Sequence, residues 1–303
     1  MEVLLTGATG YVGKQVAAKL TASGHSVTGL VRSEDEARKL EATGIRAVLG
    51  DLNTPLTVLE AARRVDAVVH TAFGHGGDFF DEVEVEQTCI DTLLAGLAGS
   101  GKTLVATSAA GVLGDTGDVP LDEDAPLPSV VDWPVAKRAA LETKLNSAAT
   151  DLCTVVLRLP VLVYGDGGSQ FPPMLIQTAK TEGVSYYVGK GSNKISAAHV
   201  ADIAELYVLA LENAPSGSLY NVAAEALKTK ELAEAVKEAA EVNATESLSV
   251  EQAGKIWNPF TALLLSMNFQ VSGEKAKREL GWSPQRISLL DDLTAGSYTN
   301  RKS

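Results

Sequence analysis

The sequence is poor in cysteine, histidine and aromatic residues, and it has fewer bases than acids. Its two cysteines, Cys89 and Cys153, are too few for a disulfide framework, and neither lies in a metal-ligand spacing. The chain has 26 lysines and arginines and 38 aspartates and glutamates, which gives a net charge of -12. This charge repels nucleic acid and anionic membranes. We therefore expect no nucleic-acid partner, no resident metal and a reducing, cytoplasmic environment.

Long apolar runs are also absent. The segments Thr261 to Met267 and Val155 to Val163, the latter interrupted by Arg158, fall short of the ~20 residues of a membrane span. The first apolar segment begins at Glu2, and we expect no export signal before it. These absences predict a soluble chain without a membrane partner. Its 303 residues suit one α/β domain with a smaller lobe.

The first half of the chain alternates short β-branched segments with longer segments of helical period, which is typical of βαβ units. The predicted strands are Glu2–Leu5, Val27–Val31, Ala47–Leu49, Ala67–His70, Thr103–Thr107 and Cys153–Leu159. The predicted helices are Gly13–Ser23, Glu34–Thr43, Pro55–Arg63, Val83–Ala98 and Val135–Ala148. The fold class is therefore α/β, with a doubly wound parallel sheet. Beyond Tyr164, a smaller lobe is expected, with helices near Pro172–Glu182, Val200–Asn213 and Lys230–Glu241 and a strand near Ser185–Val188.

A glycine-rich loop joins the first predicted strand to the first predicted helix. In this loop Gly7 permits a tight turn, Gly10 lets the backbone approach a pyrophosphate, and Gly13 lets the helix pack closely. The helix N-terminus offers free N–H groups to the anion. The alternative is an ordinary glycine-rich turn. The favoured interpretation is a Rossmann-type dinucleotide site whose loop contacts are Gly7, Thr9, Gly10, Tyr11, Val12 and Gly13.

The end of the second strand predicts the choice of dinucleotide. A carboxylate here would bind a ribose 2′-hydroxyl and indicate NAD, but the chain has Arg32, which favours NADP(H) through the 2′-phosphate. The alternative is a solvated surface arginine. Further contacts with the cofactor are expected at the ends of the third and fourth strands, from Asp51, Leu52, Thr71, Ala72 and Phe73.

A second motif, GLAGSGKT from Gly96 to Thr103, matches the pattern of a nucleotide triphosphate loop. Such a loop must follow a strand and begin a helix, whereas this one follows a helix and precedes a strand. We interpret it as a helix end and turn. The domain prediction is accordingly a single dinucleotide-binding domain over residues 1–163, and a mixed α/β substrate lobe over residues 164–303 from which some segments can return to the first domain.

With these motifs the chain resembles the extended short-chain dehydrogenase/reductase family, and is epimerase/dehydratase-like. Besides the loop, the matching segments are Asp51-Leu52, Thr107-Ser108, RLPVLVYG from Arg158 to Gly165, HVADIA from His199 to Ala204, and LGWSP from Leu280 to Pro284. The resemblance implies a Rossmann-type fold. It also implies cofactor contacts from Thr107, Leu159, Pro160 and Val161.

The catalytic pattern of that family is altered here. Its Tyr-x-x-x-Lys motif reads WPVAK, with Trp133 at the tyrosine position and Lys137 at the lysine position. The serine position falls on Ala109, with Ser108 one residue earlier, and the relay asparagine aligns with Glu86. The chain therefore resembles the atypical subgroup. Lys137 is expected to bind the nicotinamide ribose. The proton donor stays open among Tyr164, Tyr187, His75, Glu86 and water.

Substrate contacts are expected above the strand ends. The loop after the fourth strand brings Phe73 and His75, and Ala109 and Trp133 would lie near the nicotinamide. The second lobe offers Phe171, Met174, Tyr187, His199 and Trp257. A metal at His70, His75 and Asp78 is the less favoured use of those side chains.

The resulting hypothesis is an NADP(H)-dependent oxidoreductase acting on a small, mostly apolar carbonyl, enone or imine. One alternative is a non-redox isomerase, cyclase or lyase on the same scaffold. Another is a non-catalytic binding or regulatory protein that responds to NADP(H). Members of the family often pair as homodimers through the two helices predicted at Val83–Ala98 and Val135–Ala148; the resemblance therefore allows a homodimer, and the sequence leaves the oligomeric state open.

Overall fold

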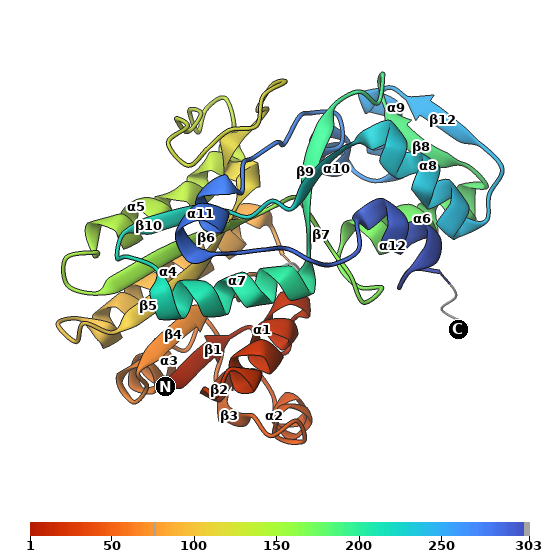
Figure 1. Ribbon diagram of the computed structural model, residues 1–303. Helices are drawn as coiled ribbons and strands as arrows, with labels where there is room; N and C mark the ends of the chain where they lie inside the picture. Colours follow the sequence, from red (N-terminus) through yellow and green to blue (C-terminus); the bar gives the residue numbers. More distant parts are fainter. Residues whose placement is uncertain (75–76, 300–303) are drawn as a thin grey trace.

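The computed structural model describes residues 1–74 and 77–299. A central sheet of seven parallel strands occupies the left and lower part of Figure 1, with the order β10-β6-β5-β4-β1-β2-β3. Its strands are β1 (Glu2–Thr6), β2 (Ser26–Val31), β3 (Arg46–Leu49), β4 (Ala67–His70), β5 (Thr103–Ala109), β6 (Cys153–Leu159) and β10 (Ser218–Asn221). The predicted doubly wound α/β fold is confirmed.

Helices cover both faces of this sheet because its strands are apolar on both sides. One face packs against α1 (Tyr11–Ala22), α2 (Glu34–Glu41), α7 (Val200–Asn213) and α11 (Glu274–Leu280). The other packs against α3 (Pro55–Arg63), α4 (Phe79–Leu97) and α5 (Ala140–Ser147). Because the strands are parallel, the carboxyl ends of β1 to β6 lie along one edge of the sheet. The predicted cofactor residues lie at this edge.

Two predicted helices begin differently in the structure. Helix α4 starts at Phe79, four residues earlier than predicted, because the Asp78 carboxylate accepts a hydrogen bond from the backbone N–H of Phe80. The segment predicted as one helix from Val135 begins instead as a 3-10 helix, η2 (Pro134–Ala139), and only then continues as α5. A 3-10 helix has three residues per turn, so it changes which side chains point inward.

The second lobe lies at the upper right of Figure 1. It contains β7 (Leu162–Tyr164), β8 (Ser185–Val188), β9 (Lys194–His199), β11 (Glu225–Lys228) and β12 (Thr245–Leu248), arranged as a β11-β9-β7 sheet and a β12-β8 pair. Its helices are α6 (Phe171–Glu182), α8 (Thr229–Ala240), α9 (Val250–Ile256), α10 (Pro259–Leu264) and α12 (Leu289–Ala295). These elements enclose a separate apolar core.

The two halves of the chain are interleaved. The sequence places helix α7 in the second lobe, but it packs against α1, and β10 pairs with β6 as the seventh strand of the central sheet. Between α4 and β5, Gly99 and Gly101 both have positive φ angles, so the GLAGSGKT segment forms a turn after a helix, as the sequence indicates. No helix in the described part of the chain is long and apolar enough to cross a membrane.

Candidate active site

The glycine-rich loop has the backbone shape that the sequence predicts. Gly7 has a φ of +76°, which favours glycine, and the N–H of Gly10 donates to the Gly7 carbonyl at 2.9 Å. A Cβ atom on Gly13 would lie 1.9 Å from the carbonyl oxygen of Gly7. A side chain at this position would therefore push α1 away from the loop.

The N-terminus of α1 is open to an anion. Gly10 caps the helix without a side chain, and the first turn contains no acidic residue. The free N–H groups and the positive end of the helix dipole therefore point out of the loop with no acidic side chain in that turn to neutralise them. This geometry fits the pyrophosphate of a dinucleotide.

Tyr11 connects this loop to the second lobe. Its hydroxyl donates to the carbonyl of Gly165 at 2.7 Å, and its ring occupies the space that a Cβ on Gly168 would need. Burial raises the pKa of Tyr11 far above its usual value, so this phenol stays protonated. Thr9 and Val12, the other predicted contacts of the loop, are half-buried.

Arg32 and Asp51 follow β2 and β3. The guanidinium of Arg32 is 76% exposed, and its contact with Glu36 is long, at 3.7 Å. It is therefore available to a ligand. One carboxylate oxygen of Asp51 accepts from the N–H of Asn53 at 2.7 Å, and Leu52 packs at the edge of the core under α3 and α4.

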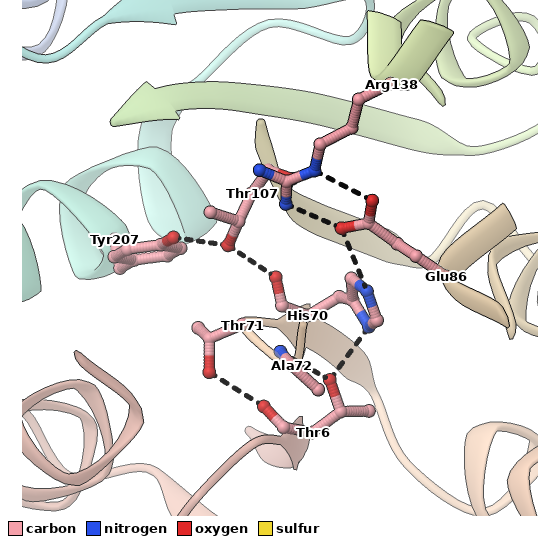
Figure 2. A network of polar contacts seen from close by, with 8 residues as sticks. All are labelled: Thr6, His70, Thr71, Ala72, Glu86, Thr107, Arg138 and Tyr207. Atoms are coloured by element: carbon pink, nitrogen blue, oxygen red, sulfur yellow. Dashed lines mark hydrogen bonds and ion pairs between the residues drawn. The ribbon is translucent and has the colours of Figure 1, made fainter. Parts of the chain in front are cut away.

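Beneath the ends of β1, β4 and β5 lies a buried polar network (Figure 2). His70 Nδ1 lies 2.8 Å from the hydroxyl of Thr6, and His70 Nε2 lies 3.9 Å from the carboxylate of Glu86. Glu86 accepts two hydrogen bonds from Arg138, at 2.8 Å from Nε and 2.7 Å from Nη2. This network runs from Thr6, the residue before Gly7, to Arg138 near the end of η2.

Hydrogen bonds also connect this network to the neighbouring strands. The hydroxyl of Thr107 donates to the carbonyl of His70 at 2.6 Å and lies 2.5 Å from the hydroxyl of Tyr207 on α7. Thr71 donates to the carbonyl of Thr6, whose hydroxyl accepts from the N–H of Ala72. These bonds fix the predicted cofactor residues Thr71, Ala72 and Thr107 in one rigid unit.

Burial lowers the pKa of His70 to about 4, with Arg138 acting in the same direction and Glu86 opposing it. The imidazole is therefore neutral near pH 7. Because the carboxylate of Glu86 is matched by the guanidinium of Arg138, the network holds one positive and one negative charge in a buried place.

Arg138, the residue after Lys137, is the base of this segment that points into the buried network. The ammonium of Lys137 is at the surface, 2.9 Å from Glu84, whereas the Arg138 side chain is 9% exposed and stacks under Phe73, 4.2 Å from its ring centroid. The 3-10 geometry of η2 turns the residue after Lys137 inward. Sequence reasoning missed Arg138; the signal available was a second base beside Lys137, preceded by a proline.

The remaining predicted catalytic residues have structural partners. Trp133 is buried, and its indole N–H donates to the carbonyl of Gly111 at 2.6 Å. The Ser108 hydroxyl donates at 2.6 Å to Glu142, which in turn pairs with Arg158. Ala109 ends β5 and is half-buried, and it offers no hydroxyl.

Tyr164 and His199 are held in the second lobe. The Tyr164 hydroxyl lies 2.9 Å from both Glu225 and the carbonyl of Ile287, and burial together with Glu225 raises its pKa far above the usual value. His199 Nδ1 accepts from the N–H of Ala201 and so caps α7, and burial lowers its pKa. The Tyr164 hydroxyl and His199 Nδ1 are therefore both engaged within the protein.

The other predicted substrate residues of the second lobe lie in or around its core. Phe171 is buried, and Met174 packs against the same core. Tyr187 and Trp257 line a cavity of about 10 Å³, which is the room of a single water. At the end of β6, Leu159 and Pro160 are buried and Val161 is half-buried. His75 lies outside the described residues; of its possible metal partners, His70 contacts Thr6 and Asp78 caps α4.

Comparison with known proteins identifies the class. The sequence model of the NAD dependent epimerase/dehydratase family matches residues 3–223, and the chain belongs to this family. An uncharacterized protein of Schizosaccharomyces pombe is 34% identical over 301 residues, which is 98% of this chain and 100% of that protein. The 2-alkyl-3-oxoalkanoate reductase of Stenotrophomonas maltophilia is 32% identical over 233 residues, 72% of this chain and 67% of that enzyme.

Among solved structures, UDP-glucose 4-epimerase of Thermus thermophilus in complex with NAD superposes with a TM-score of 0.78. It is 22% identical, and the match covers 98% of each chain. This likeness confirms the Rossmann-type fold of the extended short-chain dehydrogenase/reductases. The structural neighbour itself binds NAD. The family and its characterised relatives are mostly enzymes, and they support an oxidoreductase-type role.

Proposed function

We propose that the protein is an NADP(H)-dependent reductase of a small, mostly apolar carbonyl, enone or imine. The observation that carries this proposal is the buried Arg138–Glu86 pair at the ends of β4 and β5, beside the anion-binding loop. A related reductase of oxoalkanoates supports the reaction class. The bound nicotinamide would supply the hydride.

Arg138 would act on the charge that develops when hydride reaches the substrate. Its Nε and Nη2 donate to Glu86, which fixes the plane of the guanidinium. Among residues 1–74 and 77–299, no hydrogen bond involves its Nη1. This N–H group is therefore available to stabilise an oxyanion or to bind a hydroxyl of the cofactor's ribose.

Among the proton-donor candidates in residues 1–74 and 77–299, Trp133 and Tyr164 both use their polar hydrogens within the protein. We therefore assign the final proton to water. Conjugated carbonyls and imines suit such a site better than simple ketones, because they spread or already neutralise the developing charge. This is the physical basis of the proposed substrate class.

The decisive experiment is single-turnover oxidation of NADPH with a panel of enones, imines and ketones. The proposal expects loss of NADPH absorbance in step with reduced product, faster for the enones and imines than for the ketones. Product formed without any change in absorbance would instead indicate an isomerase, cyclase or lyase. No product from any compound, together with a partner whose affinity differs between NADPH and NADP+, would indicate a regulatory protein.

The preference for NADP(H) rests on Arg32. We expect Arg32→Ala to weaken NADPH binding by about 10- to 100-fold, the value of a charge-assisted contact, and to change NADH binding little. Arg64→Ala is the matched control, because that arginine is 78% exposed and pairs with a glutamate at 3.4 Å. Equal affinity of the unaltered protein for NADH and NADPH would disprove the assignment.

A further inference from the structure

Four of the six phenylalanines in the chain gather in one place. Phe79 is their centre: its ring lies 5.8 Å from that of Phe73, 5.4 Å from that of Phe80 and 6.1 Å from that of Phe260. We call these four residues the aromatic wall. In a chain with only 5% aromatic residues, such a concentration requires an explanation.

The aromatic wall joins the cofactor side of the molecule to the second lobe. Phe73 follows Ala72, whose Cα lies against Gly7 of the anion-binding loop, while Phe260 belongs to α10. The inner end of the wall is the stack of Phe73 on Arg138. At the outer end, the ammonium of Lys137 lies 5.8 Å from the ring of Phe80.

Part of this wall is open to solvent. Phe80 is 37% exposed and Phe260 is 44% exposed, although both are in contact distance of Phe79. Burial of rings for stability alone would place them inside a core, as it does for Phe269. An exposed apolar cluster of this kind marks a site of interaction, and aromatic rings pack well against a flat apolar ligand.

We propose that the aromatic wall selects a planar aryl-conjugated carbonyl compound, whose ring packs among the mutually tilted rings of Phe79, Phe80 and Phe260 and whose oxygen faces Arg138. This inference rests on the proposed reductase function. The hydride from NADPH forms a new C–H bond at the β-carbon, the C=C electron pair shifts to leave an enolate oxygen near Arg138, and water protonates the α-carbon. The products are the saturated carbonyl compound, NADP+ and hydroxide, which buffer neutralises.

The test compares benzalacetone with its cyclohexyl analogue, in which the phenyl ring is saturated and the enone is retained. The proposal expects a higher kcat/KM for benzalacetone. Phe260→Ala should lower that preference by about twofold to tenfold, the value of one aromatic pair. Phe260→Leu keeps an apolar side chain without a ring and should give the same loss. Val250→Ala, which removes an exposed apolar side chain from α9, should leave the preference unchanged.

Reduction of both compounds with equal kcat/KM would contradict the proposal that the aromatic wall selects an aryl ring. It would leave the proposed reductase function unaffected. If neither compound is reduced, the reductase function fails for enones, and calorimetric titration of both into the NADP+ complex still tests the wall. Tighter binding of benzalacetone that is lost in both Phe260 variants would support it. Equal affinities, or a preference that persists without the Phe260 ring, would overturn it.

Discussion

Arg138 and Glu86 form a bidentate ion pair between the segment before α5 and the middle of α4, with side chains 9% and 1% exposed. Such a pair is costly to break, because the remaining charge is left buried without a partner. Within residues 1–74 and 77–299, Nη1 of Arg138 makes no hydrogen bond, and we propose that it acts on the substrate. Stability and activity therefore depend on the pair in different ways.

This difference is measurable with a pair of variants. We expect Arg138→Met alone to lower the free energy of unfolding by about 3–5 kcal/mol, and Glu86→Leu combined with it to recover most of that loss. Activity should stay about 100-fold or more below the unaltered protein in both, because the guanidinium is gone. Urea unfolding and kcat/KM measure the two effects. Recovery of activity in the double variant would show that Arg138 is structural only.

His70 makes stability depend on pH. Its pKa is lowered from 6.5 to about 4 on folding, so between these values the unfolded chain binds a proton that the folded chain does not. The free energy of unfolding therefore decreases as the pH falls through this window, by up to about 3 kcal/mol, and His70 contributes no slope above it. His70→Gln should remove this part of the slope in urea unfolding at about pH 7 and about pH 4.5. Parallel pH profiles would contradict the prediction.

The sequence suggests a catalytic role for Ser108, whereas the structure gives its hydroxyl a partner within the protein. Its hydroxyl donates to Glu142 on the α5 side of the sheet, next to the pair of Glu142 with Arg158. We expect Ser108→Ala to cost about 1 kcal/mol of stability and to change kcat/KM by less than about twofold. Thermal unfolding and steady-state kinetics provide the comparison. A large fall in kcat at unchanged stability would instead place Ser108 in the active site.

Tyr11 connects the glycine-rich loop with the segment after β7 through a hydrogen bond to Gly165. Tyr11→Phe keeps the ring over Gly168 but removes this bond, so we expect a loss of about 1 kcal/mol and faster dissociation of NADPH. Stopped-flow fluorescence measures the dissociation rate. Tyr186→Phe, a change in the second lobe, is the control and should leave that rate unaltered.

The sequence predicts the sheet and the loop well because both depend on local patterns. The spacing of Gly7, Gly10 and Gly13 and the β-branched segments around them are sufficient to place β1, α1 and the glycine-rich loop between them. Strand bounds such as Ala67–His70 and Cys153–Leu159 agree to the residue. Each of these features involves neighbours in sequence, so no long-range contact is needed to infer it.

The active site was harder to predict because long-range contacts and a local change of helix type determine it. Whether Lys137 or Arg138 points inward depends on the 3-10 helix that begins at Pro134, and a purely α-helical register draws attention to Lys137 alone. The partner of Arg138 lies 52 residues earlier, on α4. Phe260 joins the aromatic wall from a helix that no sequence pattern connects to Phe79.

The position of β10 beside β6 has a consequence for biosynthesis. During synthesis, β1 to β6 leave the ribosome long before Ser218–Asn221. One edge of β6 therefore stays unpaired until β10 has been made. The apolar surface of α1 that α7 covers likewise stays exposed until α7 has been made. The half of the molecule that contains the central sheet is therefore completed only late in synthesis, although most of its sequence comes first.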